Sequence, residues 1–134
     1  RGGETMDMLQ AMNTGHEGSL TTVHANSARD ALGRLETLSS MSELELPVDT
    51  IRDQINGAID VIVQLERDSD GIRRVRQIEA VTSKHRDNYA TEPILSYAKS
   101  RTKNGFKYHR LPDVVIDRLS RFSETISNNF IGDF

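Results

Sequence analysis

Two histidines and an asparagine near the start of the chain have side chains that suit phosphate chemistry. His16 and His24 can each donate a ring N–H and change charge near neutral pH, and Asn26 offers both a donor and an acceptor. In an open α/β sheet, ligands bind at the carboxyl ends of the strands, and His24 and Asn26 end a run that is typical of a strand. Their position and chemistry favour a phosphate-bearing ligand over a neutral one.

Other interpretations of the same region are weighed beside this one. A histidine at the end of a strand also fits a structural hydrogen bond. Glu4, His16 and His24 could ligate a metal, but no compact motif such as H-E-x-x-H is present, so we set metal ligation aside. Ser27 lacks the G-x-S-x-G context of a nucleophile and, with Asp30 three residues on, is typical of a helix N-cap.

The pattern of apolar residues predicts the elements that position these side chains. Helical spacing indicates a helix over residues 4–13, with Gly15 placed to end it. The β-branched, almost uncharged run 19–25 predicts a short interior strand, buried on both faces. A helical stripe begins at residue 28, and another follows Pro47 and continues to about residue 59.

The second half of the sequence predicts hairpins and a final helix. Residues 61–65 and 75–81 have strand patterns and are joined by turn residues at 68–71. We expect a polar loop at 85–90, a strand at 94–98, a tight turn at Asn104-Gly105 and a returning strand at 106–109. Pro112 opens a helical pattern that continues to about residue 127, and residues 128–134 are typical of a frayed end.

Composition sets limits on the class of protein. The chain has 134 residues with 36% hydrophobic and 5% aromatic residues, enough for one lean core or part of one. Zero cysteines exclude disulfides, thiolate nucleophiles and cysteine-bound metals within this sequence. No apolar run approaches the ~18 residues of a membrane-spanning helix, and the first residues lack the apolar run of a signal peptide.

Charge argues against a dedicated nucleic-acid binder. The net charge is −3, with acids in excess over residues 1–83 and bases in excess over residues 84–134. Arg73, Arg74 and Arg76 are flanked by acids (Asp68, Asp70 and Glu79), which favours a solvated, charge-balanced surface. Four bases lie near aromatic residues, and there too we favour a solvated hairpin over a surface for single strands or lipid headgroups. These bases are Lys99, Arg101, Lys103 and Lys107.

A run of motifs in the first 80 residues is similar to one known family. Residues 1–16 (RGGETMDMLQAMNTGH), residues 18–27 (GSLTTVHANS) and the later pieces 31–36 and 47–63 resemble the traffic ATPases of type II and type IV secretion. Within them the sequence looks closest to the CpaF-type ATPases of Flp/Tad pilus assembly. The region after residue 80 is only loosely similar.

This resemblance implies an α/β fold, the C-terminal part of a RecA-like P-loop NTPase domain, with a mixed sheet, flanking helices and β-hairpins. It implies that residues 1–83 complete the ATPase domain and that residues 84–134 form a hairpin and helix extension. By the same likeness Glu4, His16 and His24 have catalytic roles near the γ-phosphate. Arg1, Thr14, Gly15 and Asn26 then contribute to nucleotide binding.

The motif that cradles the phosphates in this family is missing. No G-x-x-x-x-G-K-[ST] occurs in the 134 residues, and Gly2-Gly3 is too short to replace it. We therefore expect a C-terminal portion of a longer enzyme that uses ATP and Mg²⁺, with no cofactor bound tightly to this portion.

The resemblance also implies partners and a location. The expected partners are further copies of the chain in a homohexameric ring and a platform protein of the inner membrane, and no specific nucleic acid is expected. The expected location is peripheral, on the cytoplasmic face of the inner membrane. The alternative is a non-catalytic assembly module of a secretion or conjugation apparatus.

Overall fold

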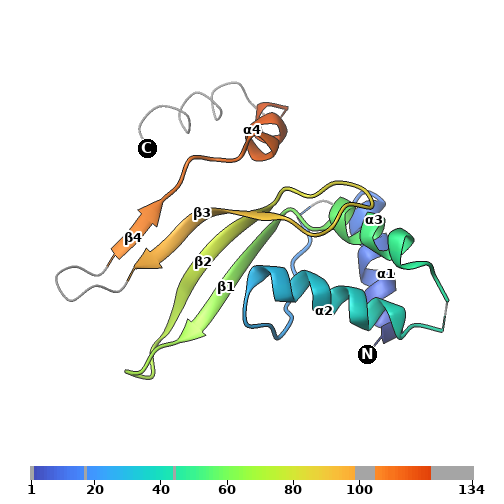
Figure 1. Cartoon of the computed structure of the whole chain (residues 1–134), viewed down its shortest axis with the longest axis horizontal. Helices are drawn as coiled ribbons and strands as arrows, with labels where there is room; N and C mark the ends of the chain where they lie inside the picture. Colours follow the sequence, from blue (N-terminus) through green and yellow to red (C-terminus); the bar gives the residue numbers. More distant parts are fainter. Residues whose placement is uncertain (1, 17, 44, 99–104, 122–134) are drawn as a thin grey trace. The chain divides into compact units, whose positions relative to one another are not determined.

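The computed structural model describes residues 2–16, 18–43, 45–98 and 105–121, and its described elements divide between two compact units. Residues 1–60 and 83–91 form the first, which we call the helical unit. Residues 61–82 and 92–134 form the second, the sheet unit. Together the described elements make a mixed α/β structure (Figure 1). The predicted boundary between residues 83 and 84 concerns the domains of a longer ATPase, which these two units do not test, so it stays a prediction.

The helical unit is built from α1 (Gly2–Asn13), α2 (Ala28–Ser40) and α3 (Val48–Ala58), each in contact with the other two. Their apolar stripes meet in one small core, because residues three and four apart share a helix face. Leu9, Leu32, Ile51 and Ile55 are completely buried there. The three helices predicted from the sequence are confirmed.

Local signals explain where these helices begin and end. The Ser27 hydroxyl accepts a hydrogen bond from the Asp30 backbone N–H at 3.1 Å and caps α2, as its spacing predicts. Gly15 follows α1 with φ +97°, a left-handed conformation that glycine adopts without strain. Pro47 precedes the first residue of α3.

The predicted interior strand at residues 19–25 is wrong. This segment has no regular secondary structure, and the Leu20 side chain is 97% exposed. A strand needs neighbours to hydrogen-bond its backbone on either side, and every described strand of the sheet lies between residues 61 and 108. The strand-like composition is real, but no described strand pairs with it.

The sheet unit carries a four-stranded sheet in which each strand is hydrogen-bonded to the next along the chain. The strands are β1 (Val61–Arg67), β2 (Arg73–Val81), β3 (Thr91–Ala98) and β4 (Gly105–Tyr108). The β1–β2 and β3–β4 pairs are antiparallel, and Gly71 takes φ +81° in the β1–β2 turn. Both predicted hairpins are confirmed, but Gly105 belongs to β4, where it pairs with Ala98, and not to the predicted tight turn; Asn104 lies outside the described residues.

Two of the three arginines of β2, Arg74 and Arg76, are paired with acids, as the sequence predicts. Arg74 contacts Asp68 at 2.6 Å and Asp70 at 2.8 Å, and Arg76 contacts Glu66 at 3.1 Å. These hydrogen-bonded carboxylates raise the pKa of Arg74. The β2 cluster is therefore a charge-balanced surface and not an open basic patch.

The end of the sequence is described in part. The helix predicted after Pro112 is α4 (Asp113–Ser120), and its predicted continuation lies outside the described residues, as do Lys99, Arg101 and Lys103. Within the described ranges no helix has the length and apolar character required to cross a bilayer.

Candidate functional site

The turn after α1 is fixed by local hydrogen bonds. The Thr14 hydroxyl donates to the backbone oxygen of Gln10 at 2.8 Å and approaches that of Ala11 at 3.3 Å. These acceptors are carbonyls of the last helical turn, which have no partner within the helix. The Ser19 hydroxyl then donates to the His16 carbonyl oxygen at 2.7 Å. The exposed His16 therefore follows a well-defined backbone turn.

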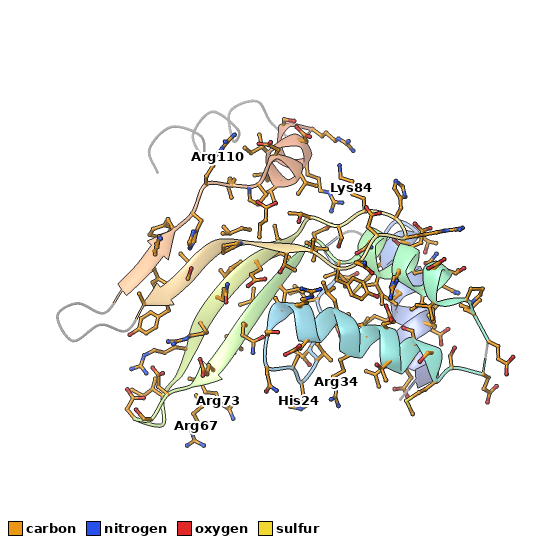
Figure 2. The ribbon with its side chains drawn as sticks, viewed as in Figure 1. His24, Arg34, Arg67, Arg73, Lys84 and Arg110 are labelled. Atoms are coloured by element: carbon orange, nitrogen blue, oxygen red, sulfur yellow. The ribbon has the colours of Figure 1, made fainter. Side chains whose placement is uncertain are left out.

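His24 and Asn26 lie at the other end of the irregular segment, next to α2. Both side chains are exposed, and Ser27 caps the helix directly after them. Figure 2 labels His24 on this segment, beside the N-terminal part of α2. Because the first N–H groups of a helix carry a partial positive charge, this place favours an anion. An imidazole, an amide and a helix start thus follow one another over residues 24–28.

Glu4 and the His16 turn are held apart by α1. Glu4 lies in the first turn of the helix and Thr14 follows its last residue. Ten residues at 1.5 Å rise separate them by about 15 Å along the helix axis. One phosphate group cannot contact both ends of this helix. Arg1, the remaining predicted site residue, lies outside the described residues.

The chain returns from the end of α1 to the start of α2, as Figure 1 shows. His16 is therefore at one end of the returning segment and His24 at the other. In the described part of the chain, no three His, Asp or Glu side chains are close enough together to hold a metal ion.

A lock between α1 and α3 was not predicted from the sequence. The Asn13 side-chain amide donates to the backbone oxygen and to Oε1 of Gln54, at 3.0 Å each. Its own oxygen lies 2.8 Å from where a Cβ on Gly57 would be. The available signal was the glycine itself, since a glycine inside a helical pattern often marks a close approach.

A second lock ties the loop after β2 to α3. Asn56 is 7% exposed, and its amide donates to the backbone oxygens of His85 at 2.8 Å and Asp87 at 3.2 Å. Its side-chain oxygen accepts from the Ser83 hydroxyl at 2.7 Å. The amide of Asn56 thus satisfies three groups at once. His85, with φ +52°, is held by this contact in a conformation that costs energy for a residue other than glycine.

Tyr89 continues this attachment on α2. Its hydroxyl donates to Glu36 Oε2 at 2.7 Å, and the same oxygen accepts from Arg52 Nε at 3.0 Å. Burial raises the pKa of Tyr89, and the hydrogen bond to the carboxylate raises that pKa further. Residues 83–90 are therefore fastened to both α2 and α3.

Comparisons with known proteins identify the family of this chain. Residues 1–105 match the family model described as "Type II/IV secretion system protein". The chain belongs to this family. The conjugal transfer protein TrbB of Rhizobium radiobacter is 39% identical over 92 residues, which are 69% of this chain and 27% of that relative.

Two further relatives are named as parts of type IV secretion systems. PtlH of Bordetella pertussis is 46% identical over 70 residues, or 50% of this chain and 20% of its own length. VirB11 of Bartonella quintana is 39% identical over 69 residues, or 50% of this chain and 19% of its own length. The chain therefore spans about a quarter or less of the curated relatives that it matches. These relationships agree with the secretion family named from its sequence motifs.

Proposed function

We propose that this chain is the C-terminal portion of an ATP-hydrolysing secretion motor. We call the longer protein that would carry it the complete ATPase. Membership in the type II/IV secretion family supports the proposal, and so does the similarity to conjugation and type IV secretion proteins. The observation that carries it is the exposed segment ending in His24 and Asn26 beside the start of α2.

The same segment supports a proposal for the fold of the complete domain. Residues 19–25 have the composition of an interior strand but pair with no described strand. We assign them to a RecA-like parallel sheet whose other strands come from outside this chain. Pairing there would bury Leu20, whose 97% exposure leaves an apolar side chain in water.

We assign the contact with the terminal phosphate of ATP mainly to His24. Its ring can donate a hydrogen bond to a phosphate oxygen, Asn26 can orient a water, and the start of α2 favours negative charge. Phosphoryl transfer depends on positioning and on neutralising the charge of the γ-phosphate, so such donors contribute directly. Glu4, in the first turn of α1, then organises the same site, and the family resemblance assigns Arg1 the same role.

His16 with Thr14 and Gly15 forms a second group at the opposite end of α1. About 15 Å of helix separates this turn from Glu4, which is assigned to the same site as His24. His16 would therefore have to reach the nucleotide from a different direction than His24. The same alanine substitution at each histidine compares the two roles. A greater loss of turnover for His24→Ala than for His16→Ala is expected.

Mg²⁺ and most of the phosphate contacts would come from the rest of the complete ATPase. In P-loop ATPases a loop of backbone N–H groups and a lysine hold the β- and γ-phosphates. This chain supplies neither, so it completes a site that it cannot form alone. The proposal extends to a hexameric ring that works with a platform protein at the cytoplasmic face of the inner membrane.

Titration of Mg-ATP against the 134-residue chain and against the complete ATPase tests the proposal. We expect no saturable binding to the chain below millimolar concentration and turnover by the complete ATPase. Micromolar affinity or hydrolysis by the chain alone would contradict the assignment of the phosphate cradle to the rest of the complete ATPase. A complete protein without a Walker A motif and without turnover would instead identify a non-catalytic assembly module.

A further inference from the structure

The contact between Asn13 and Gly57 joins the end of α1 to the last turn of α3. Gly57 leaves a notch on α3, and a Cβ there would come within 2.8 Å of Asn13 Oδ1. A separation below 3.0 Å is too short for these atoms, so any side chain at position 57 would push the amide out. The absence of a side chain at Gly57 is therefore what admits Asn13.

Two hydrogen bonds also fix the orientation of the Asn13 amide. Both of its N–H groups have acceptors on one residue, the backbone oxygen and the Oε1 atom of Gln54, at 3.0 Å each. One donor pair and one steric notch fix the position and the rotation of the side chain together. The lock joins residues 41 positions apart in the sequence, so it adds a long-range constraint to the apolar packing of α1 on α3.

Everything that follows Asn13 depends on where α1 ends. The Thr14 backbone N–H donates to Ala11 O at 3.2 Å, Gly15 turns the chain with φ +97°, and His16 O accepts from Ser19. These bonds are local, so they define the shape of the turn but not its place on the helical unit. The contact with Gln54 and Gly57, together with the apolar packing of α1, supplies that place.

We propose that Asn13 is a positioning residue for the ATP site. It fixes the point at which the chain leaves α1 and returns through His16 towards His24. This inference rests on the proposed function. Asn13 touches no phosphate in this account and acts through the segment that follows it. Loss of the lock should lower kcat and leave KM for ATP unchanged, because the phosphate cradle lies outside this chain.

Isosteric substitutions separate the lock from general destabilisation. Asn13→Asp keeps the shape but replaces the donating nitrogen with an oxygen that faces two acceptors. Gln54→Glu keeps an acceptor oxygen for Asn13. In the complete ATPase we expect kcat to fall about tenfold for Asn13→Asp and to stay near the parent value for Gln54→Glu.

Gly57→Ala and Gly33→Ala form a matched pair. Both glycines lie in helices, but a Cβ at Gly33 meets nothing within 4 Å. Alanine is the better helix former, so Gly33→Ala should raise the thermal midpoint of the chain. Gly57→Ala should raise it by less than Gly33→Ala does, because the methyl group displaces the Asn13 amide from its two hydrogen bonds. With Asn13→Ala already present the methyl group meets no amide, and adding Gly57→Ala should then raise the midpoint by as much as Gly33→Ala.

The experiment combines amide hydrogen exchange of the chain with turnover of the complete ATPase. We expect Gly57→Ala and Asn13→Asp to speed exchange at Thr14 relative to Leu32 of α2, and to lower kcat as above. His24→Ala serves as the reference for the ATP site.

Each outcome decides one point. Unchanged exchange at Thr14, or a change in midpoint for Gly57→Ala that is the same in both backgrounds, overturns the lock. Faster exchange with a parent kcat, while His24→Ala lowers kcat, overturns the positioning role. If His24→Ala also leaves kcat unchanged, the proposed site itself fails and the positioning role falls with it.

Discussion

Replacing Asn56 with alanine should strongly destabilise the chain. The substitution removes two hydrogen bonds to the carbonyls of His85 and Asp87 and one from the Ser83 hydroxyl. The two carbonyls belong to exposed residues and can turn to water, but Ser83 is 8% exposed and loses its acceptor. At about 1 kcal/mol for each bond, and more for the buried hydroxyl, the free energy of unfolding should fall by about 2–4 kcal/mol.

Urea denaturation followed by circular dichroism measures this loss. Ser83→Ala removes one bond and leaves the buried Asn56 Oδ1 without its donor, so it should cost about 1–2 kcal/mol, less than Asn56→Ala. Asn88→Ala, an exposed asparagine of the same loop, is the matched control and should change the free energy of unfolding by no more than about 0.5 kcal/mol. The reasoning is refuted if Asn56→Ala is as stable as Asn88→Ala, or if Ser83→Ala loses as much as Asn56→Ala.

Three further predictions concern single side chains. Ser39 is completely buried and its hydroxyl has no partner among the described residues, so Ser39→Ala should raise the free energy of unfolding by about 1 kcal/mol in urea denaturation. Ser27→Ala removes the N-cap of α2 and should lower it by about 1 kcal/mol in the same assay. Tyr89 has a raised pKa in the folded chain, so its contribution is complete below its ordinary pKa of 10.0 and is lost as pH rises above it. Tyr89→Phe should remove that part of the alkaline decline in the thermal midpoint.

Each of these expectations has a result that opposes it. A marked destabilisation by Ser39→Ala would show that the hydroxyl has a partner. No effect of Ser27→Ala would show that α2 does not depend on its cap. An unchanged alkaline decline in Tyr89→Phe would show that ionisation of this phenol does not control it.

Elements with strong local signals were predictable from the sequence. The capping of α2 by Ser27 needs only its own hydroxyl and the N–H of Asp30, and the stripe that follows shows which face is buried. The β1–β2 hairpin was predictable for the same reason, because Gly71 and the nearby aspartates form its turn. In such elements the interactions that decide the structure lie within a few residues.

The segment at 19–25 shows where that reasoning ends. Its β-branched residues favour a strand, but a strand exists only with neighbours, and β propensity largely reports packing against them. No described strand supplies that neighbour, so the segment stays irregular and exposed. Composition identified a strand-forming sequence and not the partner it needs.

The two locks could not be predicted for a related reason. Asn13 meets Gln54 across 41 positions, and Asn56 meets Ser83 across 27. The residues around Asn13 and Asn56 do not specify these partners, and asparagine is also common in solvent-exposed turns. The candidate site stays a prediction, made from residues that lie in one continuous stretch of the sequence. Its geometry was not predictable, since α1 separates Glu4 from the turn at His16.

The central claim is that this chain brings His24 to the terminal phosphate of a nucleotide held by the rest of the complete ATPase. Steady-state ATP turnover of that protein with His24→Ala tests it most directly, with nucleotide affinity measured in parallel. We predict that kcat falls by about 10–1,000-fold while affinity for ATP stays close to the parent value. A variant with the parent kcat would contradict the claim and leave His24 with a structural role.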